Sequence, residues 1–147
     1  VAGVATGAIA QGALVADSLG MPFVYVRSSP KDHGLENLIE GNLTPGQKVV
    51  IVEDLVSTGK SSLKAAKAVE NAGGVVGGMV AIFTYEFPEA REAFEQAGIK
   101  LITISNYSAM LKTAVKTNYI KESDVETLAK WREDPAHWVP AGREIVD

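Results

Sequence analysis

The chain has 147 residues, with 14 Lys and Arg against 18 Asp and Glu, so its formal net charge is −4 at pH 7. A hydrophobic content of 46% is enough for one folded core and excludes a disordered chain. The absence of Cys excludes disulfides and thiolate chemistry, and the acidic balance argues against a nucleic-acid-binding protein. No apolar run approaches the length of a membrane span, and we expect a cytoplasmic protein.

Short apolar runs alternate along the chain with segments of helical spacing. Strands are predicted at residues 1–5, 23–27, 48–53, 75–83 and 100–105, and helices at 7–19, 61–72, 88–97, 106–116 and 124–133. Ser123 and Glu126 have the spacing of a capping box at the start of the last helix. The apolar residues in 28–46 show neither the spacing of a helix nor that of a strand. The alternation predicts a single-domain α/β fold, with a mostly parallel sheet and helices on both faces.

The segment at residues 48–62, KVVIVEDLVSTGKSS, holds the strongest chemical signal. A buried strand delivers two adjacent acids, Glu53 and Asp54, and a hydroxyl-rich turn around Gly59 then opens a helix. The free N–H groups and the positive dipole end of a helix N-terminus favour a phosphate. Two carboxylates beside a phosphate are explained if they hold sugar hydroxyls or an intervening Mg²⁺.

Simpler interpretations account for less of this segment. A helix cap that follows an acidic strand end would reproduce part of the pattern, but the coincidence of acids, hydroxyls and Gly59 within ten residues favours a binding site. The Walker A pattern fails because Asp54 stands where its leading Gly belongs. A dinucleotide fingerprint fails because Gly3, Gly7 and Gly12 have the wrong spacing.

An apolar strand, two acids, two further residues and S/T-x-G-x-S/T form the phosphoribosyl pyrophosphate (PRPP) signature of the type I phosphoribosyltransferases. The VVIVEDLVSTGKSS segment resembles it closely, and VAGVATGAIAQG at 1–12 and YVRSSPKDHG at 25–34 are similar to segments of the orotate members of that family. The resemblance implies a type I phosphoribosyltransferase fold. It also implies transfer of phosphoribosyl from PRPP to orotate, which yields orotidine 5′-monophosphate and pyrophosphate in pyrimidine biosynthesis, with Mg²⁺ as the cofactor.

The resemblance assigns roles to single residues. Glu53 and Asp54 would hold the ribose hydroxyls, the turn at 57–61 the 5′-phosphate, and Thr6 and Gly7 the pyrophosphate. The set implied to bind PRPP is Arg27, Lys31, His33, Glu53, Asp54, Leu55, Val56, Ser57, Thr58, Gly59, Lys60 and Ser61.

The aperiodic segment would be a loop that closes on the site of the neighbouring subunit in a homodimer. Arg27, Lys31 and His33 in this loop would stabilise the departing pyrophosphate. Lys31, His33 and Asp54 are the implied catalytic residues, and Ser57 and Tyr85 the implied orotate contacts.

The chain departs from the family pattern at three positions. Ser28 stands where many relatives have Lys, Lys60 where they have Gly or Thr, and Tyr85 where several have an orotate-binding Arg. A segment that forms a hood over the base in the family is expected before residue 1, and residues 135–147 are expected to form a tail. Trp131 is expected to be a packing aromatic.

Two alternatives stay open: a phosphoribosyltransferase for a purine or uracil, and a non-catalytic PRPP-binding regulator. The expected partners are the two small-molecule substrates and a second copy of the chain, with no nucleic acid or membrane.

Overall fold

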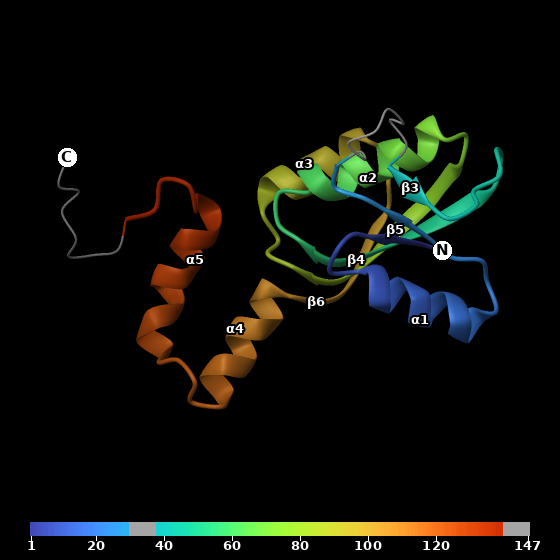
Figure 1. Cartoon of the computed structure of the whole chain (residues 1–147). Coiled ribbons are helices and arrows are strands. Elements are labelled where there is room, and N and C mark those ends of the chain that lie inside the picture. Colours follow the sequence, from blue (N-terminus) through green and yellow to red (C-terminus); the bar gives the residue numbers. More distant parts are fainter. Residues whose placement is uncertain (30–37, 140–147) are drawn as a thin grey trace.

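The computed structural model describes residues 1–29 and 38–139 (Figure 1). Lys31 and His33 lie outside these residues. The strands are β1 (Ala2–Val4), β2 (Val24–Val26), β3 (Ile39–Glu40), β4 (Lys48–Val56), β5 (Val75–Thr84) and β6 (Leu101–Asn106). The helices are α1 (Ile9–Leu19), α2 (Lys60–Asn71), α3 (Pro88–Gln96), α4 (Tyr107–Lys116), the 3₁₀ helix η1 (Glu122–Asp124) and α5 (Val125–Glu133).

The strands form one sheet in the order β3-β2-β1-β4-β5-β6. All neighbouring pairs are parallel except β2 and β3, which are antiparallel. The predicted α/β fold with a mostly parallel sheet is therefore confirmed. Strand β3 lies in the segment where no element was predicted. The carboxyl ends of β1, β4 and β5 meet at one edge of the sheet, which is where open parallel sheets bind ligands.

Helices lie on both faces of the sheet, α2 and α3 on one and α1 on the other (Figure 1). The core on the α2 side joins strand residues such as Val49 and Ile51 to the small residues Ala65 and Ala66 and to Val69 on α2. Small side chains on this helix allow it to approach the sheet closely, which holds the start of α2 near the ends of the strands.

The face that carries α1 is only partly covered. Leu14 on α1 is 70% exposed and Ile104 on β6 is 78% exposed, and Val50 and Ile82 on the strands between them are also exposed. A cavity of about 720 Å³ opens here, lined mostly by apolar side chains of α1, β4 and β5. The hood expected from the family resemblance stays a prediction.

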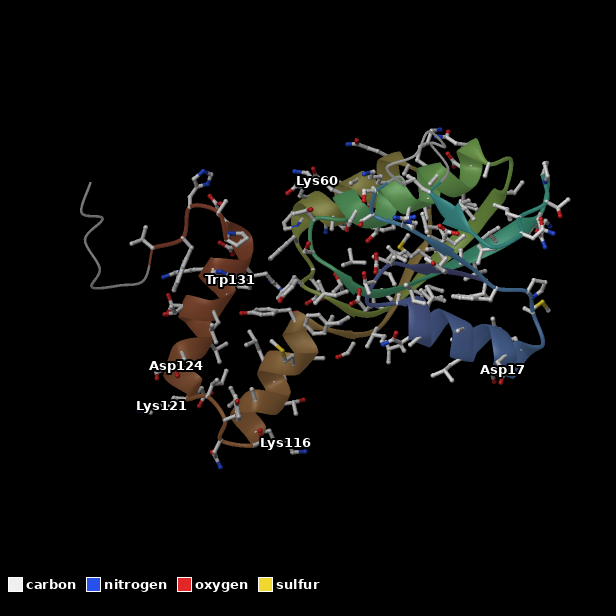
Figure 2. All side chains as sticks on the ribbon, viewed as in Figure 1. Asp17, Lys60, Lys116, Lys121, Asp124 and Trp131 are labelled. Atoms are coloured by element: carbon white, nitrogen blue, oxygen red, sulfur yellow. The ribbon has the colours of Figure 1, made fainter. Side chains whose placement is uncertain are left out.

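The helices α4 and α5 extend away from the sheet (Figure 1), and aromatic packing connects α5 to the rest. The Trp131 ring lies 5.4–5.8 Å, centroid to centroid, from the rings of Tyr85, Phe87 and Tyr107. Figure 2 shows Trp131 on the side of α5 that faces the core. The prediction that Trp131 is a packing aromatic is therefore confirmed.

The predicted capping box of Ser123 and Glu126 is wrong. The Asp124 side chain instead caps the 3₁₀ helix η1: its Oδ2 accepts a hydrogen bond from the Lys121 N–H at 3.1 Å, and the Ser123 hydroxyl donates to its Oδ1 at 3.3 Å. Because η1 leads directly into α5, the N-cap of α5 is Asp124, and no side chain makes a capping hydrogen bond there. No helix within residues 1–29 and 38–139 has both the length and the apolar character needed to cross a membrane.

Candidate functional site

The two acids of the signature lie within β4, which continues to Val56, three residues beyond the predicted end. Pairing of β4 with β5 persists to Val56 and Thr84, and this pairing extends the strand. Because side chains alternate along a strand, Glu53 and Asp54 point to opposite faces of the sheet. Glu53 faces α2 and Asp54 faces the turn between β1 and α1, so each acid meets a different part of the site.

Glu53 is buried, with 4% of its surface exposed. Its Oε2 accepts a hydrogen bond from the Ser62 hydroxyl at 2.9 Å, and its Oε1 accepts one from the Asp54 N–H at 3.1 Å. The pKa of Glu53 is raised from 4.5 to about 7, chiefly by burial and also by the Asp54 side chain, against the lowering effect of the Ser62 hydroxyl and the Asp54 N–H. Glu53 is therefore a carboxyl group that titrates near neutral pH.

Asp54 lies against the turn that carries Thr6 and Gly7. A Cβ atom placed on Gly7 would overlap the Asp54 carboxylate, so glycine is what allows the turn to approach this side chain. Asp54 Oδ1 accepts a hydrogen bond from the Leu55 N–H at 2.8 Å. The structure thus brings the predicted pyrophosphate turn and the second acid of the signature together, although Gly7 and Asp54 are 47 positions apart in the chain.

The turn that follows β4 presents a helix N-terminus to the same edge of the sheet. Gly59 is the N-cap of α2 and has a left-handed φ of +81°, a conformation that glycine adopts without strain. No side chain makes a capping hydrogen bond at the start of α2, and the Leu63 N–H donates to the Gly59 carbonyl at 2.8 Å. The N–H groups of residues 60–62 precede this first helical bond, so they are available to an anion such as a phosphate.

Three other predicted residues have partners of their own. The Arg27 guanidinium is 3.2 Å from Glu40 Oε1 on β3. Lys60, which Figure 2 labels at the start of α2, pairs with Glu89 on α3 at 3.0 Å, and both side chains are exposed. Tyr85 packs between Phe83 and Phe87, with ring centroids 5.4 and 5.3 Å away, inside the aromatic cluster that holds α5.

The remaining residues of the predicted set lie along the same connection between β4 and α2. Leu55 is exposed and Val56 is fully buried, so the Val56 side chain is part of the core. Ser57 and Thr58 are half-buried ahead of Gly59, and Ser61 is exposed on the first turn of α2. In residues 1–29 and 38–139, no three His, Asp or Glu side chains lie together as a metal-binding group.

Sequence reasoning missed Ser62. This side chain is 1% exposed and donates to Glu53 from the third residue of α2. A buried hydroxyl on a helix face otherwise built from Ala and Val was the available signal, but the identity of its partner depends on where β4 lies beneath the helix.

Comparisons with known proteins agree with this geometry. Residues 1–109 match the model of the phosphoribosyl transferase domain. The chain is 65% identical over 138 residues to an orotate phosphoribosyltransferase of Bacteroides thetaiotaomicron, with 94% of this chain and 65% of that protein covered.

Solved structures of phosphoribosyltransferases also superpose on this chain. The orotate phosphoribosyltransferase of Aeropyrum pernix superposes with a TM-score of 0.67 at 30% identity, over 80% of this chain and 63% of that one. The adenine phosphoribosyltransferase of Thermoanaerobacter pseudethanolicus superposes with a TM-score of 0.60 at 30% identity, over 72% of this chain and 68% of that one. The chain spans about 65% of the length of the curated relatives it matches. Because the family model matches 109 of its 147 residues, the chain belongs to the phosphoribosyl transferase domain family.

Proposed function

We propose that the whole protein is an orotate phosphoribosyltransferase, which transfers phosphoribosyl from PRPP to orotate. The observation that carries this proposal is the meeting of three groups at the carboxyl ends of β1 and β4. These groups are the uncapped start of α2, the Gly7 turn packed on Asp54, and the buried carboxyl of Glu53. The identity to curated orotate enzymes supports orotate as the acceptor.

In the proposed mechanism, the protein binds PRPP in three places. The N–H groups at the start of α2 bind the 5′-phosphate, Glu53 and Asp54 accept hydrogen bonds from the ribose hydroxyls, and the Thr6–Gly7 turn binds the pyrophosphate. The bond between the anomeric carbon and the pyrophosphate oxygen breaks, and its electron pair leaves with the pyrophosphate. The orotate ring nitrogen then supplies the pair that forms the new bond to that carbon, and its N–H proton passes to the departing pyrophosphate. Arg27, Lys31 and His33 are proposed to stabilise the leaving group.

Mg²⁺ is proposed to arrive with the substrate. Mg²⁺ keeps several waters and is commonly bound through substrate phosphates with one or two carboxylates, and the described residues offer no group of three acids or histidines. When bound, the ion would neutralise charge on the pyrophosphate. The protein residues would then position the substrate and exclude water from the anomeric carbon.

A panel of acceptors tests the proposed activity. Pyrophosphate release is measured from Mg·PRPP with the whole natural protein, and orotate, uracil, adenine and hypoxanthine are offered separately. Release with orotate alone is the expected result. Release with adenine or hypoxanthine would replace orotate by a purine acceptor, and binding of PRPP without release for any base would indicate the regulator.

The proposed homodimer has its own test, because a loop that acts in trans can be complemented. Lys31→Ala and Asp54→Asn subunits, each inactive alone, are mixed under conditions of subunit exchange. Partial recovery of activity is expected, since one of the two sites in each heterodimer then has both residues. Confirmed exchange without recovery would contradict a loop that acts across subunits.

A further inference from the structure

Ser62 is an unusual residue for its place in the fold. It lies on the buried face of α2, where its neighbours one turn and two turns along are Ala65, Ala66 and Val69. Alanine would fill this position and is the better helix former, whereas a buried hydroxyl must find a hydrogen-bond partner. The partner is Glu53 Oε2, at 2.9 Å.

The hydrogen bond joins two parts of the proposed site. Glu53 belongs to β4 and is proposed to hold the ribose, while Ser62 belongs to the first turn of α2, whose N–H groups are proposed to bind the 5′-phosphate. With the Asp54 N–H on Oε1 and the Ser62 hydroxyl on Oε2, both oxygens of the Glu53 carboxyl are oriented by the protein. Such fixed orientation lowers the entropy that substrate binding must otherwise remove.

We propose that Ser62 is a positioning residue for PRPP, whose hydroxyl ties the Glu53 carboxyl to the start of α2 so that the ribose and 5′-phosphate sites form one rigid unit. This inference rests on the proposed function. Ser62 itself lies beneath the site with 1% of its surface exposed, so it acts through Glu53 and does not touch the substrate.

The charges around Glu53 make the role of Ser62 dependent on pH. Asp54 is the neighbouring acid on β4 and raises the pKa of Glu53, as burial does, whereas the Ser62 hydroxyl lowers it. The nearby cations of α2 have other partners: Lys60 pairs with Glu89, and Lys64 donates to the Ser28 carbonyl. Loss of the hydroxyl therefore leaves a smaller fraction of Glu53 ionised at neutral pH.

The test compares Ser62→Ala with the unsubstituted whole protein by calorimetric titration of Mg·PRPP between pH 6.5 and 8.5. We expect affinity for Mg·PRPP to fall about tenfold at pH 7, because the hydroxyl donates to a charged group. The deficit should shrink as the pH rises and Glu53 ionises in both proteins. Ser62→Thr, which keeps the hydroxyl, should restore most of the affinity.

Two further variants separate positioning from general loosening of the helix. Ala65→Gly weakens α2 one turn along the same buried face without touching Glu53, and should leave the pH dependence of PRPP binding unchanged. In a Glu53→Gln background, Ser62→Ala should cause no additional loss of affinity, because the carboxylate through which Ser62 acts is gone.

The outcomes distinguish this inference from the proposed function. If the unsubstituted protein does not bind Mg·PRPP, the proposed function fails. If it binds, and Ser62→Ala binds equally well at every pH, or if the effects of Ser62→Ala and Glu53→Gln add independently, then Ser62 does not position Glu53 and the inference is overturned.

Discussion

Replacement of Gly7 by alanine is the sharpest perturbation that the structure offers. The backbone at Gly7 lies outside the left-handed region, so alanine is compatible with its conformation. The added methyl would, however, overlap Asp54 Oδ2 and lie 3.1 Å from Oδ1. The atoms in the way belong to the end of a half-buried side chain. The expected response is therefore that the Asp54 carboxylate moves and the fold stays intact.

The size of the effect follows from that displacement. The carboxylate must move by roughly 1 Å, and a misplacement of this size in an active site lowers the rate by about 100-fold. The corresponding loss of transition-state stabilisation is about 2.7 kcal/mol. The free energy of unfolding should change by less than about 1 kcal/mol, because Ala in place of Gly also reduces the entropy of the unfolded chain. Activity and stability are thus expected to separate.

The assay is kcat/KM for PRPP from pyrophosphate release, together with thermal unfolding of the same samples. Gly77→Ala is the matched control: Gly77 lies on β5, its backbone φ is also outside the left-handed region, and its added Cβ would meet only the Val49 carbonyl at an ordinary 3.6 Å. This control should keep full activity. If Gly7→Ala also keeps full activity, the close approach of the turn to Asp54 has no role in the reaction and the reasoning fails.

Three further predictions address other parts of the molecule. Asp54→Asn keeps the shape of the side chain and removes its charge, so Mg·PRPP affinity measured by calorimetry should fall at least about tenfold; unchanged affinity would remove Asp54 from the site. Trp131→Ala should lower the free energy of unfolding by about 2 kcal/mol and speed amide exchange in α5, since its ring packs on Tyr85, Phe87 and Tyr107; unchanged exchange in α5 would contradict this anchoring role. The raised pKa of Glu53 means that the folded state holds this proton more tightly than the unfolded state. The associated stability is full below pH 4.5 and is lost as the pH rises through about 7, a loss of about 3 kcal/mol. The thermal midpoint of the unsubstituted protein should therefore fall as the pH rises from 5 to 8, whereas that of Glu53→Gln should not. Equal slopes of midpoint against pH in the two proteins would be evidence against the buried carboxyl as the source of the pH dependence.

The elements of the fold were predicted to within a few residues where long apolar runs or helical spacing define them, as in β4, β5 and α2. β3 was not predicted because a strand of two residues is too short to show an alternation of apolar and polar side chains. It forms through antiparallel pairing with β2 and the ion pair between Arg27 and Glu40. The end of β4 was placed too early, since acids are rare in buried strands. Ladder pairing with β5 outweighs that preference and continues past both acids.

The class of fold and the PRPP signature can be predicted from the amino-acid sequence, because apolar periodicity and the acid–hydroxyl–glycine spacing are local properties of the chain. Tertiary structure alone decided that Glu53 and Asp54 face opposite sides, that Gly7 packs on Asp54, and that Ser62 holds Glu53. It also decided that Tyr85 joins an aromatic cluster with Trp131. Each of these features depends on how far β4 continues beside β5 and on the distance between a helix and the sheet. No local pattern specifies those quantities.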